Sequence, residues 1–92
     1  MVRGKGIWRI RLTSHAERDL DHILKQSLEF HRHLIEELKA LEANPFPAPP
    51  KAKKLRGLNG IFWRLRVGAF RVVYRPLEPQ TLLILRITPP PV

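Results

Sequence analysis

The stretch FWRLRVGAFRVVY, residues 62–74, constrains the fold of this chain more than any other segment. Its apolar and basic residues alternate on both sides of Gly68-Ala69, and type II′ hairpin turns prefer glycine in the first of their two positions. This pattern predicts an antiparallel hairpin in which Arg66 lies directly opposite Arg71. The other predicted pairs are Val67–Phe70, Leu65–Val72, Arg64–Val73 and Trp63–Tyr74.

The predicted register divides the hairpin into two faces, because successive side chains of a strand point to opposite sides of the sheet. One face is a continuous apolar surface for the core, made by Trp63, Leu65, Val67, Phe70, Val72 and Tyr74. The other carries Arg64, Arg66 and Arg71, with Phe62, Val73 and Arg75 beside them. Like charges placed opposite each other destabilise a strand pair, so this face predicts an anionic ligand, and phosphate matches the planar guanidinium fork. The alternative is a solvated outer face whose arginine stems cover apolar surface.

The charge balance also predicts a polyanionic partner. Lys and Arg number 17 against 8 Asp and Glu, which gives a net charge of +9. Seven of the 8 acidic residues lie within residues 13–44, and Glu78 is the only acid elsewhere. The basic excess therefore lies almost wholly outside that segment, which favours a directed patch over a basic surface that serves only solubility.

The first half of the chain predicts a strand followed by helical structure. Residues 7–12, IWRIRL, alternate as a half-buried strand does, and Ser14 with Glu17, or Thr13 instead, supplies a helix N-cap. An apolar stripe at helical spacing then runs to residue 43. A single helix of that length has little to pack against in so small a domain, so we expect a helical hairpin that breaks at Lys25–Gln26, with Ser27 capping the second helix. The stripe consists of Ala16, Leu20, Ile23, Leu24, Phe30, Leu34, Leu38 and Leu41.

The second half predicts a stiff connection and a set of strands. Asn44-Pro45 ends the helix, and NPFPAPP, residues 44–50, reads as an extended crossover more readily than as a proline-rich recognition motif. KAKKLRGLNG is expected to be a basic loop that ends in a turn at Asn59-Gly60. Three strands follow, over residues 61–67, 70–75 and 81–88. The fold class is α+β, in a single domain over residues 1–92.

Several classes of function are not expected. The chain has no cysteine, so it has neither disulfides nor thiolate metal ligands, and no apolar run approaches the length of a membrane span or a signal peptide. We therefore expect a cytoplasmic protein without a membrane partner. The four histidines lack the spacing of a metal site, so no metal or other cofactor is expected: His15, His22, His31 and His33.

Three runs together resemble the RelE/ParE superfamily of type II toxin–antitoxin toxins: AKKLRGL, WRLRVGAFRVVY and LLILRIT, placed after a strand and a helix pair. The resemblance extends from Ile7 to about Ile87 and is most specific between Lys54 and Tyr74. It implies a RelE-like fold of order β-α-α-β-β-β, in which a helical hairpin packs on one face of a twisted antiparallel sheet. It also implies a toxin that is neutralised by a cognate antitoxin.

For RelE-like members the resemblance implies a metal-independent endoribonuclease, an mRNA interferase that cuts mRNA on the ribosome and so inhibits translation. The ribose 2′-hydroxyl attacks the adjacent phosphate, and guanidinium groups stabilise the charge that develops. On this sequence the catalytic positions are Arg64, Arg66 and Arg71. The expected RNA contacts are Lys51, Lys53, Lys54, Arg56, Arg75 and Arg86.

Two other functions stay open. RelE-like nucleases continue after the last strand with an Arg and then a Tyr or His that transfers protons, and residues 86–92, RITPPPV, hold no counterpart to that pair. Tyr74 belongs to the predicted core face and is a poor replacement. The chain is therefore alternatively a ParE-like inhibitor of DNA gyrase, or a catalytically weak homologue that mainly binds its antitoxin.

Overall fold

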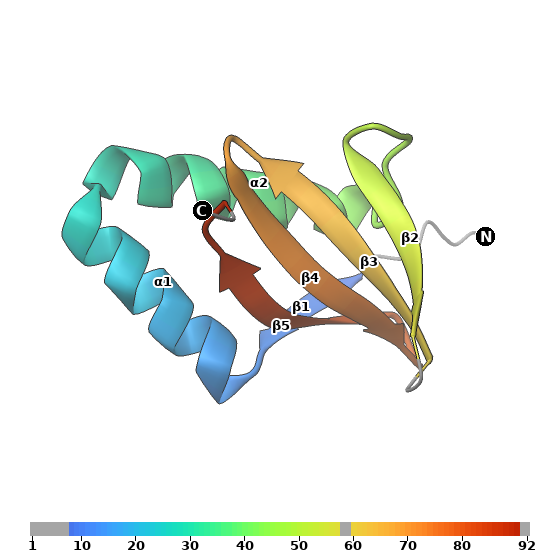
Figure 1. Cartoon of the computed structure of the whole chain (residues 1–92). Coiled ribbons are helices and arrows are strands. Elements are labelled where there is room, and N and C mark those ends of the chain that lie inside the picture. The colour runs from blue at the N-terminus through green and yellow to red at the C-terminus, as the bar shows by residue number, and fades with distance from the viewer. Residues whose placement is uncertain (1–7, 58–59, 91–92) are drawn as a thin grey trace.

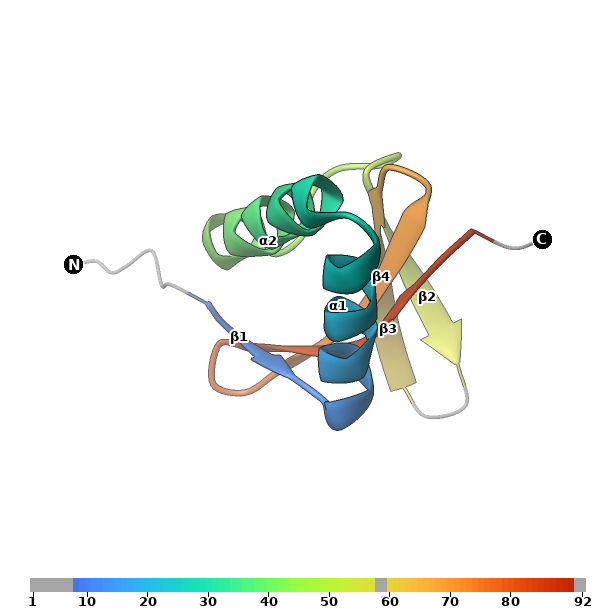
Figure 2. The same cartoon turned by 90° about the vertical axis from the view of Figure 1, so that its left-hand side faces the viewer.

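A pair of helices covers one face of a five-stranded sheet in the computed structural model, which describes residues 8–57 and 60–90 (Figure 1). Seen from the side, both helices lie on the same side of the strands (Figure 2). The elements in chain order are β1 (Arg9–Leu12), α1 (Ser14–Gln26), α2 (Leu28–Ala43), β2 (Ala52–Gly57), β3 (Gly60–Val67), β4 (Phe70–Leu77) and β5 (Thr81–Thr88).

The α+β class and the helical hairpin on one face of the sheet are confirmed, and two details of the sheet differ from expectation. The strand order is β1-β5-β4-β3-β2, and β1 pairs with β5 in parallel while the other pairs are antiparallel. No short turn joins β1 to β5, so hairpin geometry does not dictate their relative direction. The second difference is the expected basic loop, which is strand β2; its lysines are tolerated because it lies at the sheet edge. The predicted turn at Asn59-Gly60 falls partly outside the described residues.

The break between the helices lies at Ser27, which caps the second helix as predicted, whereas Lys25 and Gln26, where the bend was expected, still belong to α1. Ser27 has extended backbone angles, its hydroxyl accepts a hydrogen bond from the Phe30 N–H at 3.1 Å, and its own N–H donates to Ile23 O at 2.8 Å. One serine thus satisfies backbone groups of both helices without a glycine or proline. At the start of α1 the cap is Thr13, the second of the two candidates, whose hydroxyl accepts from the Ala16 N–H at 3.1 Å.

The core lies between the helical hairpin and the apolar face of the sheet. Leu34 from α2 and Leu65, Val72, Leu82 and Ile84 from the strands are fully buried. The apolar stripe therefore packs largely as its periodicity predicts, although Leu24 at the end of α1 is 41% exposed. The remaining core members are Ala16, Leu20, Ile23, Leu38, Leu41, Ala52, Val67, Tyr74 and Ile87.

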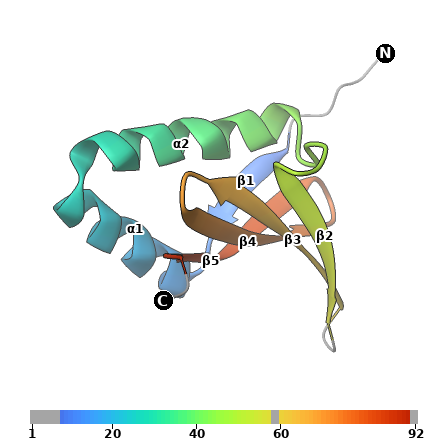
Figure 3. The same ribbon diagram turned by 45° about the horizontal axis from the view of Figure 1, so that its top comes forward.

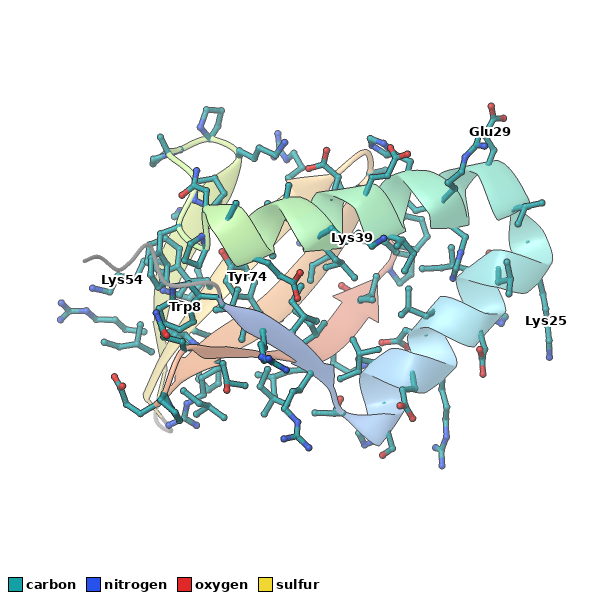
Figure 4. All side chains as sticks on the ribbon, turned by 180° about the vertical axis from the view of Figure 1, so that it is seen from behind. Trp8, Lys25, Glu29, Lys39, Lys54 and Tyr74 are labelled. Carbon is teal, nitrogen blue, oxygen red and sulfur yellow. The ribbon has the colours of Figure 1, made fainter. Side chains whose placement is uncertain are left out.

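The proline-rich connection is fastened to the sheet by one buried tyrosine. The Tyr74 hydroxyl, fully buried beneath α2, donates a hydrogen bond to Pro45 O at 2.7 Å (Figure 4). This bond holds the chain where it leaves α2 and so fixes the path by which it reaches β2. Neither helix of the described part of the chain is long and apolar enough to cross a membrane.

Candidate phosphate-binding site

The β3–β4 hairpin has the predicted register. Arg66 pairs with Arg71, and the other predicted pairs down to Trp63–Tyr74 are also present. Within the turn only Gly68 has a positive φ, of 58°, as a type II′ turn requires. The turn lies beside α2 (Figure 3), and a Cβ added at Gly68 would stand 3.3 Å from the Phe30 ring, so a side chain there would crowd the ring as well as strain the backbone.

Strand β2 places a further cation beside the arginine face. Lys53 pairs with Arg64 across the β2–β3 ladder, and its side chain therefore points to the same face as Arg64 and Arg66. The Arg66 N–H donates to Lys51 O at 2.9 Å, which extends the pairing by one residue. Together these contacts form a cleft of about 410 Å³, which we call the arginine cleft; it is lined by Pro49, Pro50, Lys51, Lys53, Arg64, Arg66 and Arg71.

The arginine cleft has the composition of a phosphate site. None of the described residues that line it is acidic, and all three predicted catalytic arginines contribute to it. Arg66 is exposed, whereas Arg64 and Arg71 are half-buried. Each guanidinium offers several N–H donors in a fixed plane and stays protonated, so the cleft can bind phosphate oxygens and stabilise added negative charge.

One lysine of the cleft already has an acidic partner. The Lys51 ammonium lies 2.8 Å from a carboxylate oxygen of Glu37, which extends from α2. The Lys51 side chain is 51% exposed, so this ion pair is a weak one that an incoming phosphate can replace. Glu37 was not anticipated from the sequence, since its helical position carries no sign that α2 passes this edge of the sheet.

Four of the expected RNA contacts do not line the cleft: Lys54, Arg56, Arg75 and Arg86. Lys54 and Arg56 lie on β2 with Lys53; Lys54 alternates with Lys53 and points to the opposite face of the sheet, and Arg56 follows on the same face as Lys54. The Arg75 guanidinium lies over the Phe62 ring at 5.5 Å, in a cation–π contact. Lys54 and Arg56 point away from the cleft because β2 is a strand, in which side chains alternate between the two faces. In the expected loop no such alternation would have been imposed.

Arg86, the remaining expected contact, belongs to a structural ion pair. Its Nε lies 2.9 Å from Asp19 Oδ2, and the same carboxylate accepts from the Ile87 N–H at 2.8 Å. Burial by itself raises the pKa of Asp19, but the hydrogen bonds from Arg86 and Ile87 and the charges of Arg86 and His15 outweigh it, so the pKa lies below its usual range. Asp19 thus joins α1 to a stretch of β5 beyond its pairing with β1.

The Tyr74 position agrees with the predicted core orientation and has a chemical consequence. Burial raises the pKa of the Tyr74 hydroxyl, and that hydroxyl already donates to Pro45. It does not line the arginine cleft. Tyr74 is therefore a structural residue.

A second hollow adjoins the arginine cleft. It has a volume of about 420 Å³ and shares Pro50, Lys51 and Arg66 with the cleft, while α2 contributes His33 and Glu37. No sequence pattern connects His33 with the arginines, because the helices were expected on the far side of the sheet. The edge of α2 nevertheless reaches the rim of the cleft at the β3–β4 turn.

Comparison with known proteins identifies the family. Residues 10–89 match the family described as ParE toxin of type II toxin-antitoxin system, parDE. No curated protein matches the chain. Among solved structures, a chain of the RelBE2 toxin–antitoxin complex from Mycobacterium tuberculosis is 26% identical, with a TM-score of 0.71 over 90% of this chain and 98% of the other.

Two further structures show the same fold at lower identity. A chain of the archaeal RelE–RelB complex from Pyrococcus horikoshii has a TM-score of 0.75 at 23% identity, over 90% of this chain and 94% of the other. The YoeB/ParE toxin from Agrobacterium tumefaciens has a TM-score of 0.75 at 18% identity, over 88% of this chain and 96% of the other. The family match spans the helices, the arginine hairpin and β5 alike. The chain belongs to the ParE toxin family of type II toxin–antitoxin systems, within the RelE/ParE superfamily.

Proposed function

We propose that this toxin is a metal-independent endoribonuclease that cuts mRNA on the ribosome and that the arginine cleft is its active site. One observation carries the proposal: Arg64, Arg66 and Arg71 converge with Lys53 in a single cleft whose described lining holds no acid. A surface that served only solubility would have no reason to place Arg66 and Arg71 opposite each other at a cost in stability.

The cleft fits the chemistry of RNA cleavage by transfer within the substrate. The ribose 2′-oxygen forms a bond to the adjacent phosphorus, the bond to the 5′-oxygen breaks, and the products are a 2′,3′-cyclic phosphate and a 5′-hydroxyl. The phosphoryl oxygens gain charge on the way, and the three guanidinium groups stabilise that charge. Arginine remains protonated, so the cleft arginines do not take the proton from the 2′-hydroxyl.

Proton transfer in this proposal comes from the hollow beside the cleft. His33 and Glu37 line that hollow together with Arg66, so an RNA bound across Arg66 would reach both. An imidazole can accept a proton from one oxygen and return it to another, which is the role of the Tyr or His that RelE-like nucleases use for proton transfer. Tyr74 cannot supply it, because its hydroxyl is buried and already donates a hydrogen bond.

A cognate antitoxin is the expected partner and control of this activity. Two of the similar structures are toxin–antitoxin complexes, RelE–RelB and RelBE2. The net charge of +9 favours an acidic neutralising segment in the antitoxin. The ribosome and its mRNA are the proposed targets, and we place the protein in the cytoplasm, where they occur.

Inhibition of DNA gyrase is the second candidate, and the family match favours it, since that match is to ParE toxins. It would also explain a cleft whose described lining holds no histidine, tyrosine or carboxylate that could transfer protons. In such a toxin the arginine face would bind the enzyme or its DNA and would cut nothing.

One experiment separates the two functions. The toxin is induced in cells, the 5′ ends of messages are mapped, and gyrase supercoiling is assayed with the purified protein. New ends within translated codons that disappear in Arg71→Ala but persist in Arg9→Ala, a strand arginine outside the cleft, support the nuclease. Intact messages together with inhibited supercoiling would overturn it in favour of the gyrase inhibitor.

A further inference from the structure

An aromatic hollow lies at the end of the sheet that is farther from the break between the two helices. It measures about 510 Å³, and we call it the aromatic hollow; its described lining includes Phe46, Lys54, Ile61, Trp63, Arg75 and Pro76. The Phe46 and Trp63 rings lie 4.8 Å apart, and Trp8 meets Phe46 edge-on at 5.8 Å. Phe46 is 39% exposed and Ile61 42%, so apolar surface is open to solvent here.

The hollow exists because the pairing of β3 with β4 ends before β4 does. That pairing stops at Trp63–Tyr74, whereas β4 continues along β5 as far as Leu77. Pro76 has no N–H to donate to a neighbouring strand, so a ladder to β3 cannot continue through it. Arg75 approaches the space past Gly60, where an added Cβ would stand 3.3 Å from the guanidinium.

The same edge strand borders both the aromatic hollow and the arginine cleft. Lys53 of β2 lines the cleft, and its neighbour Lys54 lines the hollow on the opposite face. Arg56 follows on the same face as Lys54. Strand β2 is last in the sheet order, so no further strand of the described chain separates the two sites on that side. Lys54 and Trp8 lie together at this end, opposite Lys25 and Glu29 (Figure 4).

We propose that single-stranded RNA held in the arginine cleft continues over the edge of β2 and stacks a base in the aromatic hollow. This inference rests on the proposed RNA substrate and extends it to a second subsite. Single-strand binding proteins combine aromatic platforms with cations that follow the backbone, and Phe46 and Trp63 with Lys54 and Arg75 supply both. Cations on both faces of one edge strand match the regularly spaced phosphates of a single polyanion better than one anchoring side chain of a peptide.

The test uses uridine oligonucleotides of about 4 and about 12 nucleotides, a range of site sizes typical of single-strand binding, with a 2′-O-methyl backbone that the toxin cannot cut. Lys54→Glu and Phe46→Ala should each weaken the long probe about tenfold and leave the short probe unchanged. Lys39→Glu, the same charge change on the exposed surface of α2, is the matched control. It should change the affinities for the long and the short probe equally. The long probe should also quench tryptophan fluorescence more than the short one, since both tryptophans of the chain lie in this cluster.

The outcomes separate this inference from the proposed function. If the short probe binds and depends on Arg71, but the hollow variants bind the long probe as Lys39→Glu does, the RNA path over β2 is overturned and the proposed active site stands. The same result with loss of antitoxin binding in the hollow variants would assign the hollow to the antitoxin. If neither probe binds, and Arg71→Ala leaves the message 5′ ends of the induction experiment unchanged, both proposals fail.

Discussion

Arg66 and Arg71 lie directly opposite each other in the β3–β4 hairpin, and both side chains line the arginine cleft. Without an anion between them, two like charges at this spacing weaken the strand pair. The pair is therefore a place where folding stability and phosphate binding are opposed, and this opposition can be measured directly.

Replacing Arg71 by threonine should stabilise the folded protein and weaken RNA binding. Removal of the repulsion should raise the free energy of unfolding by up to about 1 kcal/mol, since threonine also suits a strand. Affinity for an uncleavable single-stranded RNA should fall at least about tenfold with the lost charge-assisted contact. Thermal unfolding and RNA titration check the two effects, with Arg9→Thr on β1 as the control. Lower stability with unchanged RNA affinity would contradict the assignment of the cleft.

The salt dependence of RNA binding should report the number of cleft cations. For single strands the slope of log K against log salt is about −0.7 per phosphate contact, so Lys53, Arg64, Arg66 and Arg71 predict a slope near −3. Arg64→Ala should make the slope shallower by about 0.7, while Arg9→Ala should leave it unchanged. Titrations across a series of salt concentrations measure it, and a flat dependence would mean that the cleft does not hold phosphates.

Breaking the Glu37–Lys51 ion pair should strengthen RNA binding. Glu37→Gln frees Lys51 for phosphate, and an exposed pair of this kind is worth up to about 1 kcal/mol, so we expect a gain in affinity of about two- to fivefold. The gain should vanish when Lys51→Ala is added, which a double-mutant cycle of affinities tests. An equal gain in both backgrounds would show that Glu37 repels RNA directly and does not act through Lys51.

Asp19 should make folding stability depend on pH in the acid range. Its folded pKa is lower than the unfolded value of 3.8, so its contribution is fully present above that value and is lost as the pH falls below it towards the folded pKa. Asp19→Asn should cost about 1–2 kcal/mol at neutral pH, because the carboxylate accepts from Ile87 and pairs with Arg86, and should make little difference at the acid end. Denaturant unfolding across pH measures this, with the exposed Asp21→Asn of the same helix as control.

Tyr74→Phe should affect stability and leave RNA cleavage intact. The variant keeps the buried ring but leaves Pro45 O without its hydrogen bond, which should cost about 1 kcal/mol of unfolding free energy. The turnover of a cleavable RNA should be unchanged below the unfolding temperature. A loss of turnover with unaltered stability would instead make Tyr74 a proton-transfer residue.

Local patterns in the sequence determined much of this fold. Period-two alternation around Gly68-Ala69 was sufficient to predict every residue pair of the arginine hairpin, because a two-residue turn sets the register of both strands. The helix break at Ser27 was likewise predictable, since N-cap chemistry involves residues only a few positions apart. Strand alternation and the turn are therefore enough to place the three arginines on one face.

Contacts between distant segments could not be predicted in this way. The strand character of residues 52–57 comes from pairing with the free edge of β3, and the composition of that segment alone favours a loop. Once β2 forms, alternation sends Lys53 into the cleft and Lys54 to the aromatic hollow, and this separates residues that looked equivalent in the sequence. The pairing of Arg86 with Asp19, 67 positions away, could not be predicted either, because only the packing of α1 against β5 brings the two residues together.

The sequence by itself thus determined the α+β class, the register of the hairpin and a face of three arginines, because these depend on spacing between near neighbours. The tertiary structure alone decided which cations share a site, which are held by Glu37 or Asp19, and where aromatic rings gather beside Lys54. Those relationships depend on how far-separated segments pack, and the packing energy is spread over the whole core and leaves no mark in any short stretch of the chain.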